Sequence, residues 1–458
     1  MPEFAKLSVI AAPADELFAW HARPGTLQRL LPPWQKIQVL ESRGGITDGA
    51  RTVLSLRKGP FRFRWVAVHR DYQEGRDFTD DQLQGPFADW RHTHRVLPLS
   101  DSSSQLEDDI RYRLPFSPVG GWLAGAAVRR DLQRTFDFRH KRTADDLARH
   151  AASRLTRPLR IIISGASGLI GTTLTAFLSA AGHEVRRLVR RPARGGDEIA
   201  WNPGSGIIDS SGLEGADAFI HLSGRNLAAL RWTAAVKREI RRSRIDSTRL
   251  VAETLARLSR PPRTLISASA IGYYAGRGDE IMDEQKPPGQ GFLADLCRDW
   301  EAASQPAREA GLRVVNLRTG LVVTASGGFL AKMLLPFRAG FGGPLGDGRQ
   351  YMSWIVLDDL LGAILHLLAN DGISGPVNAV APNAVRNIEF TRALGSVLKR
   401  PTFARVPSFV LHGLFGEMGQ ALFLDSARVE PSRLTKSGFR FFYPRLEDAL
   451  RAELGRLA

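Results

Sequence analysis

The sequence has almost no cysteine and no long apolar run. Cys297 is the only cysteine among 458 residues, which excludes internal disulfides and any cysteine-rich zinc site. No stretch approaches the roughly 20 consecutive apolar residues of a membrane-spanning helix. The N-terminus also lacks the charged-then-apolar layout of a signal peptide. We therefore expect a cytoplasmic protein without a membrane span.

The net charge of +16 raises the question of nucleic-acid binding, because basic proteins attract phosphate backbones. The excess is spread along the chain, with +4 in residues 1–150 and +12 in the remainder. There is no basic tail and no basic stripe with interleaved aromatic residues. The densest basic cluster lies on one expected helix: Lys237, Arg238, Arg241, Arg242 and Arg244. A basic face that attracts small anions explains this charge equally well, so we expect a small-molecule substrate and no nucleic-acid partner.

The most informative stretch runs from Arg160 to Gly171. A short β-branched run ends at three glycines in G-x-x-G-x-x-G spacing, and an amphipathic helix pattern follows. Glycines permit close backbone approach, and a helix N-terminus offers free N–H groups and a positive dipole end to a pyrophosphate. We expect a dinucleotide to contact this turn at Gly165, Ser167, Gly168, Leu169, Ile170 and Gly171.

The residues that distinguish NADP(H) from NAD(H) are expected at the end of the next strand. That strand, His183 to Val189, is followed by Arg190 and Arg191, roughly twenty residues past the last glycine. An acidic residue there would bind the ribose 2′-hydroxyl, whereas an arginine favours a 2′-phosphate. We predict NADP(H) over NAD(H), with Arg190 as a contact. The alternative is that both arginines are merely solvated.

Strands and helices alternate through the rest of this region. Strands are expected at residues 216–222, 264–269 and 312–317, and helices at 233–258 and 293–310. This alternation predicts a doubly wound parallel sheet with helices on both faces, an α/β Rossmann-like fold. The third strand ends at Leu222, Ser223 and Gly224, where the backbone can pass under the adenine ribose. We expect these three residues to contact the cofactor.

Residues 1 to about 150 have a different pattern. A first strand (4–11) and a short helix (14–20) precede segments of period-two alternation, and a long helix closes the unit. In one such segment Leu106, Asp108, Ile110, Tyr112 and Leu114 share a face, and in another Phe63, Trp65 and Ala67 do.

This order resembles the START/Bet v 1-like helix-grip fold of the polyketide cyclase and lipid-transport superfamily. The resemblance implies an α+β domain whose cavity takes an apolar or aromatic ligand. Equally, Phe63, Trp65, Trp90 and Tyr112 would fill an ordinary core.

His92 and His94 lie two apart on an expected strand and so face the same way. Two such histidines suit a metal, but only Asp108 offers a further ligand in the sequence. We therefore expect polar side chains that line a cavity and no metal site.

A set of short motifs then points to a family. They are Ser164-Gly165-x-x-Gly168-x-x-Gly171, Leu222-Ser223-Gly224, Arg231-Trp232-Thr233, Ser267-Ala268-Ser269-Ala270-Ile271-Gly272-Tyr273-Tyr274, Leu317-Arg318-Thr319-Gly320, Gly342-Gly343-Pro344-Leu345-Gly346 and Met352-Ser353-Trp354-Ile355. Together they resemble an atypical branch of the extended short-chain dehydrogenase/reductases, the epimerase-family proteins. Val406 to Leu454 resembles the small C-terminal domain of unknown function found in that branch. We expect three domains, at residues 1–152, 159–400 and 401–458.

The resemblance implies a serine that holds the substrate oxygen, here Ser269, and a Tyr-x-x-x-Lys pair that moves the proton. When this sequence is aligned with the family at Glu301, Leu293 and Cys297 fall at the tyrosine and lysine positions of that pair. Neither side chain can replace the tyrosine or the lysine in proton transfer. Tyr274 is the best substitute, because Tyr273 aligns with a tyrosine that is structural in relatives. We therefore expect Ser269 and Tyr274 to be catalytic.

Arg318 is expected at the cofactor or, with Arg349 from the glycine-rich loop 340–349, at an anionic substrate. Two functions stay open on this evidence. One is an NADP(H)-dependent oxidoreductase or epimerase-like enzyme with a hydrophobic-ligand domain. The other is a non-catalytic NADP(H)-binding sensor or ligand-presenting protein. The oligomeric state is not indicated.

Overall fold

The computed structural model describes residues 3–115, 121–228 and 231–457. Its chain forms two compact units. The first comprises Met1–Leu155, Ala176–Gly182 and Arg451–Ala458, and the second comprises Thr156–Thr175 and His183–Leu450. The predicted boundary at residue 401 stays a prediction.

The first unit is built on one antiparallel sheet of seven strands in the order β1-β7-β6-β5-β4-β3-β2. Its strands are β1 (Glu3–Ile10), β2 (Lys36–Arg43), β3 (Arg51–Lys58), β4 (Phe61–Gln73), β5 (Asp77–Gln84), β6 (Asp89–Ser100) and β7 (Ser103–Arg113). Each strand from β2 to β7 pairs with the next one along the chain, and β1 closes onto β7. This is the meander that short turns between alternating segments predict.

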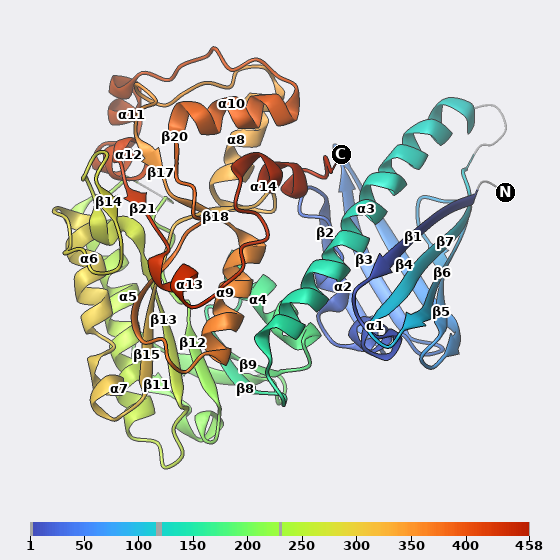
Figure 1. Ribbon diagram of the computed structural model, residues 1–458, viewed down its shortest axis with the longest axis horizontal. Helices are drawn as coiled ribbons and strands as arrows, with labels where there is room; N and C mark the ends of the chain where they lie inside the picture. Colours follow the sequence, from blue (N-terminus) through green and yellow to red (C-terminus); the bar gives the residue numbers. More distant parts are fainter. Residues whose placement is uncertain (1–2, 116–120, 229–230, 458) are drawn as a thin grey trace. The chain divides into compact units, whose positions relative to one another are not determined.

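Three helices accompany this sheet: α1 (Ala14–Ala22), α2 (Thr26–Arg29) and α3 (Gly121–Ser153). The long α3 crosses one face of the sheet (Figure 1). Its Phe136 packs in a core cluster with Phe4, Trp90 and Tyr112, and all four side chains are buried. The helix-grip prediction is confirmed, and these aromatic residues take part in core packing.

Along β7 the predicted alternation is confirmed, because Leu106, Asp108, Ile110 and Tyr112 are all buried. The prediction for β4 is met only in part. A register shift against β5 lies between Val66 and Ala67, and Phe63 before it is 38% exposed. A β-bulge changes the direction in which the side chains on either side of it point. The alternation of apolar and polar residues does not show where a bulge will form.

The second unit is built on an eight-stranded sheet in the order β11-β10-β9-β8-β12-β13-β15-β19. Its strands are β8 (Arg160–Ser164), β9 (Glu184–Val189), β10 (Glu198–Asn202), β11 (Ile207–Ile208), β12 (Ala218–His221), β13 (Thr264–Ala270), β15 (Arg313–Thr319) and β19 (Gly375–Ala379). All neighbours are parallel except β10 and β11. The chain order reverses between β8 and β12, and ligands bind at such a point, beyond the carboxyl ends of the strands.

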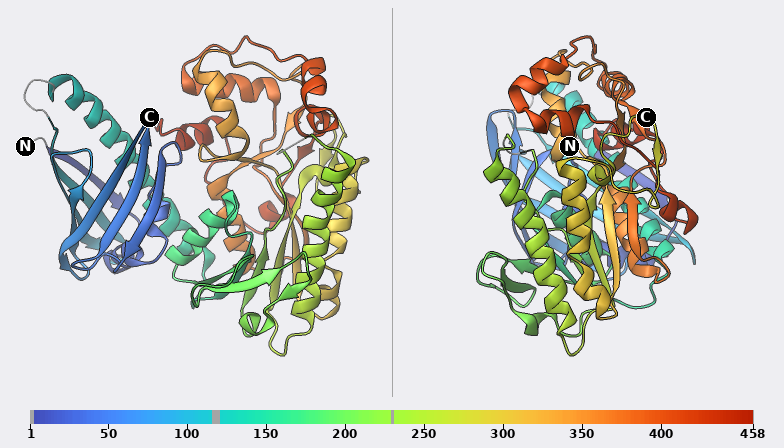
Figure 2. Two further views of the ribbon diagram at one scale, coloured as in Figure 1. Left: turned by 180° about the vertical axis from the view of Figure 1, so that it is seen from behind. Right: turned by 90° about the vertical axis from the view of Figure 1, so that its left-hand side faces the viewer.

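Helices cover both faces of this sheet (Figure 2). They include α4 (Leu169–Ala180), α5 (Ala234–Ala256), α6 (Phe292–Ala302), α7 (Gln305–Glu309) and α9 (Leu357–Ala369). A further helix, α8 (Gly328–Arg338), packs against the short strand β16 (Leu321–Val323). The single helix predicted over 293–310 is two helices, because Pro306 begins a new one in the first turn of α7.

The remaining elements are short or follow β19. The helices are α10 (Asn387–Leu398), α11 (Ser408–Phe415), α12 (Glu417–Gly419), α13 (Ser432–Lys436) and α14 (Leu446–Glu453). Small strand pairs join β14 (Ile281–Met282) to β21 (Arg428–Val429), β16 (Leu321–Val323) to β18 (Trp354–Val356), and β17 (Tyr351–Met352) to β20 (Val385–Arg386). Within the described ranges, no helix is both long and apolar enough to cross a membrane.

Candidate functional site

The glycine-rich turn joins β8 to α4 at the carboxyl edge of the parallel sheet. Gly165 has φ +74°, and a Cβ at this position would lie 2.7 Å from the carbonyl carbon of Leu222 at the end of β12. A Cβ on Gly171 would lie 2.2 Å from the carbonyl oxygen of Gly165. Any side chain at either position would therefore push the turn, the helix and β12 apart. This is the packing role that the first and last glycines of such a turn require.

The turn presents backbone rather than side chains. The Gly168 N–H donates to the Gly165 carbonyl at 3.0 Å, which closes a tight loop, and Ser167 and Gly168 are exposed. At the start of α4 (Leu169) the first N–H groups have no acceptor one turn earlier in the helix, while the Thr172 N–H donates to the Gly168 carbonyl at 2.9 Å. Free N–H groups at the positive end of a helix dipole fit the pyrophosphate of a dinucleotide.

A buried polar chain supports the turn from below. Ser164 Oγ lies 2.6 Å from His221 Nδ1, and His221 Nε2 lies 3.2 Å from Ser247 Oγ on α5. Burial lowers the pKa of His221 to about 3, so the imidazole is neutral at physiological pH. The chain thus ties the ends of β8 and β12 to α5 without placing a charge under the cofactor turn.

Arg244 braces the segment that follows β12. Its guanidinium donates to the carbonyl of Arg225 at 2.8 Å, and Ser243 Oγ accepts from the Arg225 N–H at 3.1 Å. A Cβ on Gly224 would lie 3.3 Å from Arg244 Cζ, so this glycine lets the backbone pass close over the guanidinium. Burial lowers the pKa of Arg244 to about 10, which leaves it a cation at neutral pH. Leu222 and Ser223, just before Gly224, are half-buried.

The two arginines after β9 have different surroundings. Arg191 donates to both carboxylate oxygens of Glu198 at 2.6 and 2.7 Å. Arg190 is exposed, and it forms no ion pair within the described part of the chain. Arg190 can therefore reach a ligand without first giving up a partner.

On the far side of the switch point, a buried network joins the predicted catalytic residues. Ser269 Oγ, at the end of β13, donates to Glu301 Oε1 on α6 at 2.7 Å. Arg318 on β15 donates to both oxygens of the same carboxylate at 2.7 and 2.8 Å. Arg318 also donates to Tyr274 Oη at 2.7 Å, and Tyr274 Oη donates to Asn378 Oδ1 on β19 at 2.9 Å. Ser269, Tyr274 and Arg318 thus lie in one cluster.

Electrostatics fix the charges of this cluster. Burial alone would lower the pKa of Arg318, but Glu301 and Tyr274 raise it above its ordinary value. Burial raises the pKa of Tyr274 to about 12, although Arg318 opposes the shift. Tyr274 is fully buried, and its hydroxyl lies between Arg318 and Asn378. Its role as a proton relay stays a prediction, and these contacts favour a positioning role instead.

Leu293 and Cys297 lie on α6, where the resemblance places the Tyr-x-x-x-Lys pair. Both are buried. Burial raises the pKa of the Cys297 thiol to about 12, so it is uncharged and unreactive at neutral pH. Neither residue supplies a proton.

Two members of the cluster were missed as functional residues in the sequence. Glu301 was used only to align α6 with the family motif, and no sequence motif pointed to Asn378. Glu301 follows Cys297 by four residues and so lies on the same face of α6, which was the one available sign. Arg349 is exposed, and its carbonyl accepts a hydrogen bond from Arg386, so its predicted action with Arg318 on an anionic substrate stays a prediction.

Comparison with known families matches three regions of the chain. The NAD dependent epimerase/dehydratase family matches residues 161–379. The polyketide cyclase/dehydrase and lipid transport family matches residues 10–138. A domain of unknown function matches residues 406–453.

Relatives match either most of the chain or about two thirds of it. An epimerase family protein of Mycobacterium bovis is 44% identical over 290 residues, which is 63% of this chain and 96% of the relative. The crystal structure of the nucleoside-diphosphate sugar epimerase from Corynebacterium glutamicum is 33% identical with a TM-score of 0.82, over 99% of this chain and 90% of that one. The crystal structure of human epimerase family protein SDR39U1 with NADPH is 33% identical with a TM-score of 0.60, over 65% of this chain and all of that one.

Proposed function

The chain belongs to the NAD dependent epimerase/dehydratase family, and from this premise we propose that it is an NADP(H)-dependent oxidoreductase or epimerase-like enzyme. The observation that carries the proposal is the turn at Gly165–Gly171, where a Cβ on the first or last glycine would meet backbone atoms and where the N-terminus of α4 begins. A bound nicotinamide supplies a hydride donor or acceptor. The substrate is a small molecule with a carbonyl or alcohol group.

The phosphorylated dinucleotide is preferred because Arg190 is exposed at the end of β9. A 2′-phosphate placed there would gain a charge-assisted hydrogen bond that a 2′-hydroxyl lacks. The human relative, 33% identical, was crystallised with NADPH, which supports the same choice.

Ser269 is the residue proposed to hold the substrate oxygen. Its hydroxyl proton is directed at Glu301, so the Oγ lone pairs are available to accept a hydrogen bond from a substrate alcohol. Arg318 holds Glu301 in place for this contact, and Tyr274 accepts a hydrogen bond from Arg318. In this scheme Ser269 is catalytic, and Tyr274 is a positioning residue.

A second candidate is a non-catalytic NADP(H)-binding protein that senses the cofactor or presents a ligand. It is favoured by the same buried Tyr274 and by Leu293 and Cys297 at the positions of the proton-moving pair. If a panel of carbonyl and alcohol substrates gave no turnover despite tight cofactor binding, this candidate would replace the first.

Cofactor binding is tested with Ser167→Asp. Ser167 is exposed on the turn, so the variant adds a negative charge beside the pyrophosphate without disturbing the core. We expect NADPH affinity, measured by fluorescence titration, to fall by about 10-fold or more, equivalent to about 1.4 kcal/mol. Ser167→Asn keeps the size without the charge and should bind much as the wild type does. Undiminished binding by Ser167→Asp would contradict the assigned pyrophosphate position.

A further inference from the structure

The interior of the first unit contains a cluster of histidines and aspartates that the cofactor site does not use. Asp80 on β5 lies directly opposite His92 on β6, and His94 lies opposite Asp108 on β7. Residues two apart on a strand share a face, so His92 and His94 point the same way. All but Asp80 are buried, and His140 from α3 reaches the same cluster.

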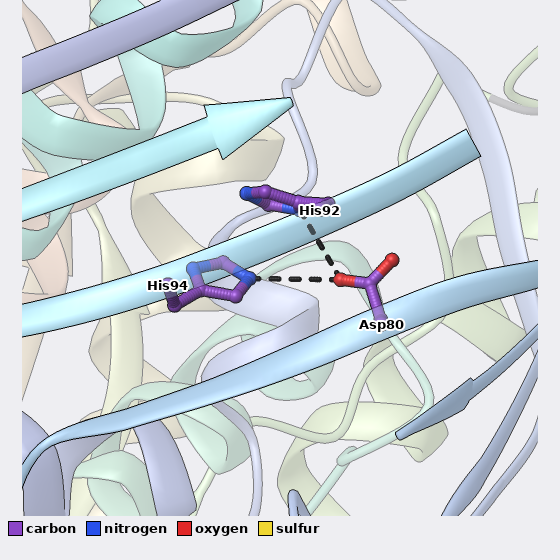
Figure 3. Close-up of side chains that lie close together, drawn as sticks. All are labelled: Asp80, His92 and His94. Atoms are coloured by element: carbon purple, nitrogen blue, oxygen red, sulfur yellow. Dashed lines mark ion pairs between the residues drawn. The ribbon is translucent and has the colours of Figure 1, made fainter. Parts of the chain in front are cut away.

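One nitrogen of each ring on β6 faces Asp80. Asp80 Oδ1 lies 3.1 Å from His92 Nδ1 and 3.6 Å from His94 Nε2 (Figure 3). One potential ligand atom from each of the three residues lies within 4.8 Å of the others. Tetrahedral zinc with bonds of about 2 Å separates its ligand atoms by about 3.3 Å, and the two distances from Asp80 Oδ1 to the ring nitrogens are close to this value.

The other nitrogen of each ring faces Asp108. His92 Nε2 lies 2.9 Å and His94 Nδ1 lies 2.5 Å from Asp108 Oδ1, and His140 Nε2 lies 2.6 Å from Oδ2. When the Asp108 carboxylate accepts the N–H of His92 Nε2, the inner Nδ1 of that neutral ring keeps its lone pair. Metal-binding histidines have this arrangement, in which a second carboxylate fixes the tautomer.

Two carboxylates this close together need compensating positive charge. Asp108 is buried against His92, His94 and His140, and Asp80 lies against His92 and His94. A divalent cation bound between the two rings and Asp80 would supply that charge.

From this arrangement we propose that Asp80, His92 Nδ1 and His94 Nε2 bind a divalent transition-metal ion, with Asp108 as the positioning carboxylate. Two nitrogens and one oxygen form a donor set that Zn²⁺ and Fe²⁺ accept. The fourth position is left to water or to an oxygen atom of a bound molecule. The site is independent of the proposed redox function, because its residues all belong to the first unit.

The experiment uses the full chain, purified without chelators. Elemental analysis and titration with Co²⁺, followed by visible absorption, measure metal content and coordination. We expect about one equivalent of metal and the intense bands of a four-coordinate Co²⁺ site. A wild-type protein that takes up neither Zn²⁺ nor Co²⁺ would overturn the proposal, and this result requires no variant to fold.

Variants then identify the ligands. Asp80→Asn should lower Co²⁺ affinity by at least about 10-fold, and Asp108→Asn should lower it by about 10- to 100-fold. The matched control is Asp81→Asn, since Asp81 is the next residue on β5 and faces Arg70 and Arg91 at 3.4 and 3.9 Å. Circular dichroism and thermal unfolding confirm that each variant is folded. Equal Co²⁺ affinity in Asp80→Asn and Asp81→Asn would refute the ligand assignment.

Discussion

Two neighbouring arginines at the end of β9 are held differently, and only one is available to a ligand. Arg191 is paired with Glu198, whereas Arg190 is exposed. We predict that Arg190→Asp lowers the preference for NADPH over NADH by about 10-fold or more, because it replaces an attraction to the 2′-phosphate with a repulsion. Fluorescence titrations with both dinucleotides measure the preference.

The control for that experiment is Arg242→Asp, which makes the same charge change on the exposed face of α5. The preference of Arg242→Asp for NADPH over NADH should match that of the wild type. If both variants shift equally, net charge rather than a specific contact decides the preference.

His221 makes the stability of the second unit depend on pH. Its pKa is about 3 in the folded protein against 6.5 for an unperturbed histidine, because burial disfavours the charged form. The unfolded chain therefore binds an extra proton below pH 6.5, and stability falls as the pH drops from 6.5 towards 3.

We expect His221→Gln to reduce this slope by about 1.4 kcal/mol per pH unit. Urea unfolding at a series of pH values measures the slope. The variant loses some stability at neutral pH, since one hydrogen bond to Ser164 or Ser247 is weakened. An unchanged slope would show that other groups cause the acid sensitivity.

The sequence identified residues whose roles follow from local order. The glycines of the β8–α4 turn are the clearest case, because spacing, preceding strand and following helix are all local. Glu301, Asn378 and Asp80 were missed because their partners come from other strands, and register decides which side chains meet. Ser269 and Arg318 were found through motif resemblance, and their roles stay predictions.

At the scale of elements, one ion pair connects helix α6 to strand β15. The side chain of Arg318 is only 3% exposed and that of Glu301 12%, so removing one partner leaves the other charge buried. We predict that Glu301→Gln lowers the free energy of unfolding by about 3 kcal/mol, measured by urea denaturation.

Asp295→Asn on the same helix is the matched control. Its partner Arg298 lies at 3.0 Å, but both side chains are at least half exposed, and such pairs contribute less than about 1 kcal/mol. Similar losses in the two variants would mean that the ion pair between α6 and β15 contributes no more than a surface pair.

Element types were predicted better than element boundaries. Both sheets could be predicted from the periodicity of apolar residues, because this periodicity is a property of each local segment. The break between α6 and α7 was missed although Pro306 marks it, because the apolar pattern continues across the break. The shift in β4 could not be predicted, since a bulge depends on pairing with β5.

At the scale of the whole molecule, the two proposed sites lie in different compact units. Each ligand should therefore protect its own unit in amide hydrogen exchange. At about 100 times its dissociation constant a ligand stabilises the unit that binds it by about 2.7 kcal/mol, or about 100-fold slower exchange of its core amides.

NADPH should slow exchange in residues 160–175 and 183–225, and Zn²⁺ should slow it in residues 77–113. Mass spectrometry of peptides resolves the two regions in one experiment. Protection of both regions by either ligand alone would contradict the assignment of separate sites. The Asp80→Asn variant should retain the effect of NADPH and lose that of Zn²⁺.

The buried Cys297 has a practical consequence. Since the chain's one native thiol is uncharged and shielded from solvent, a cysteine engineered on the surface becomes the unique attachment point for a maleimide dye. Two such cysteines, one in each unit, would accept a donor and an acceptor fluorophore. Energy transfer between them would then measure how far apart the units are in solution.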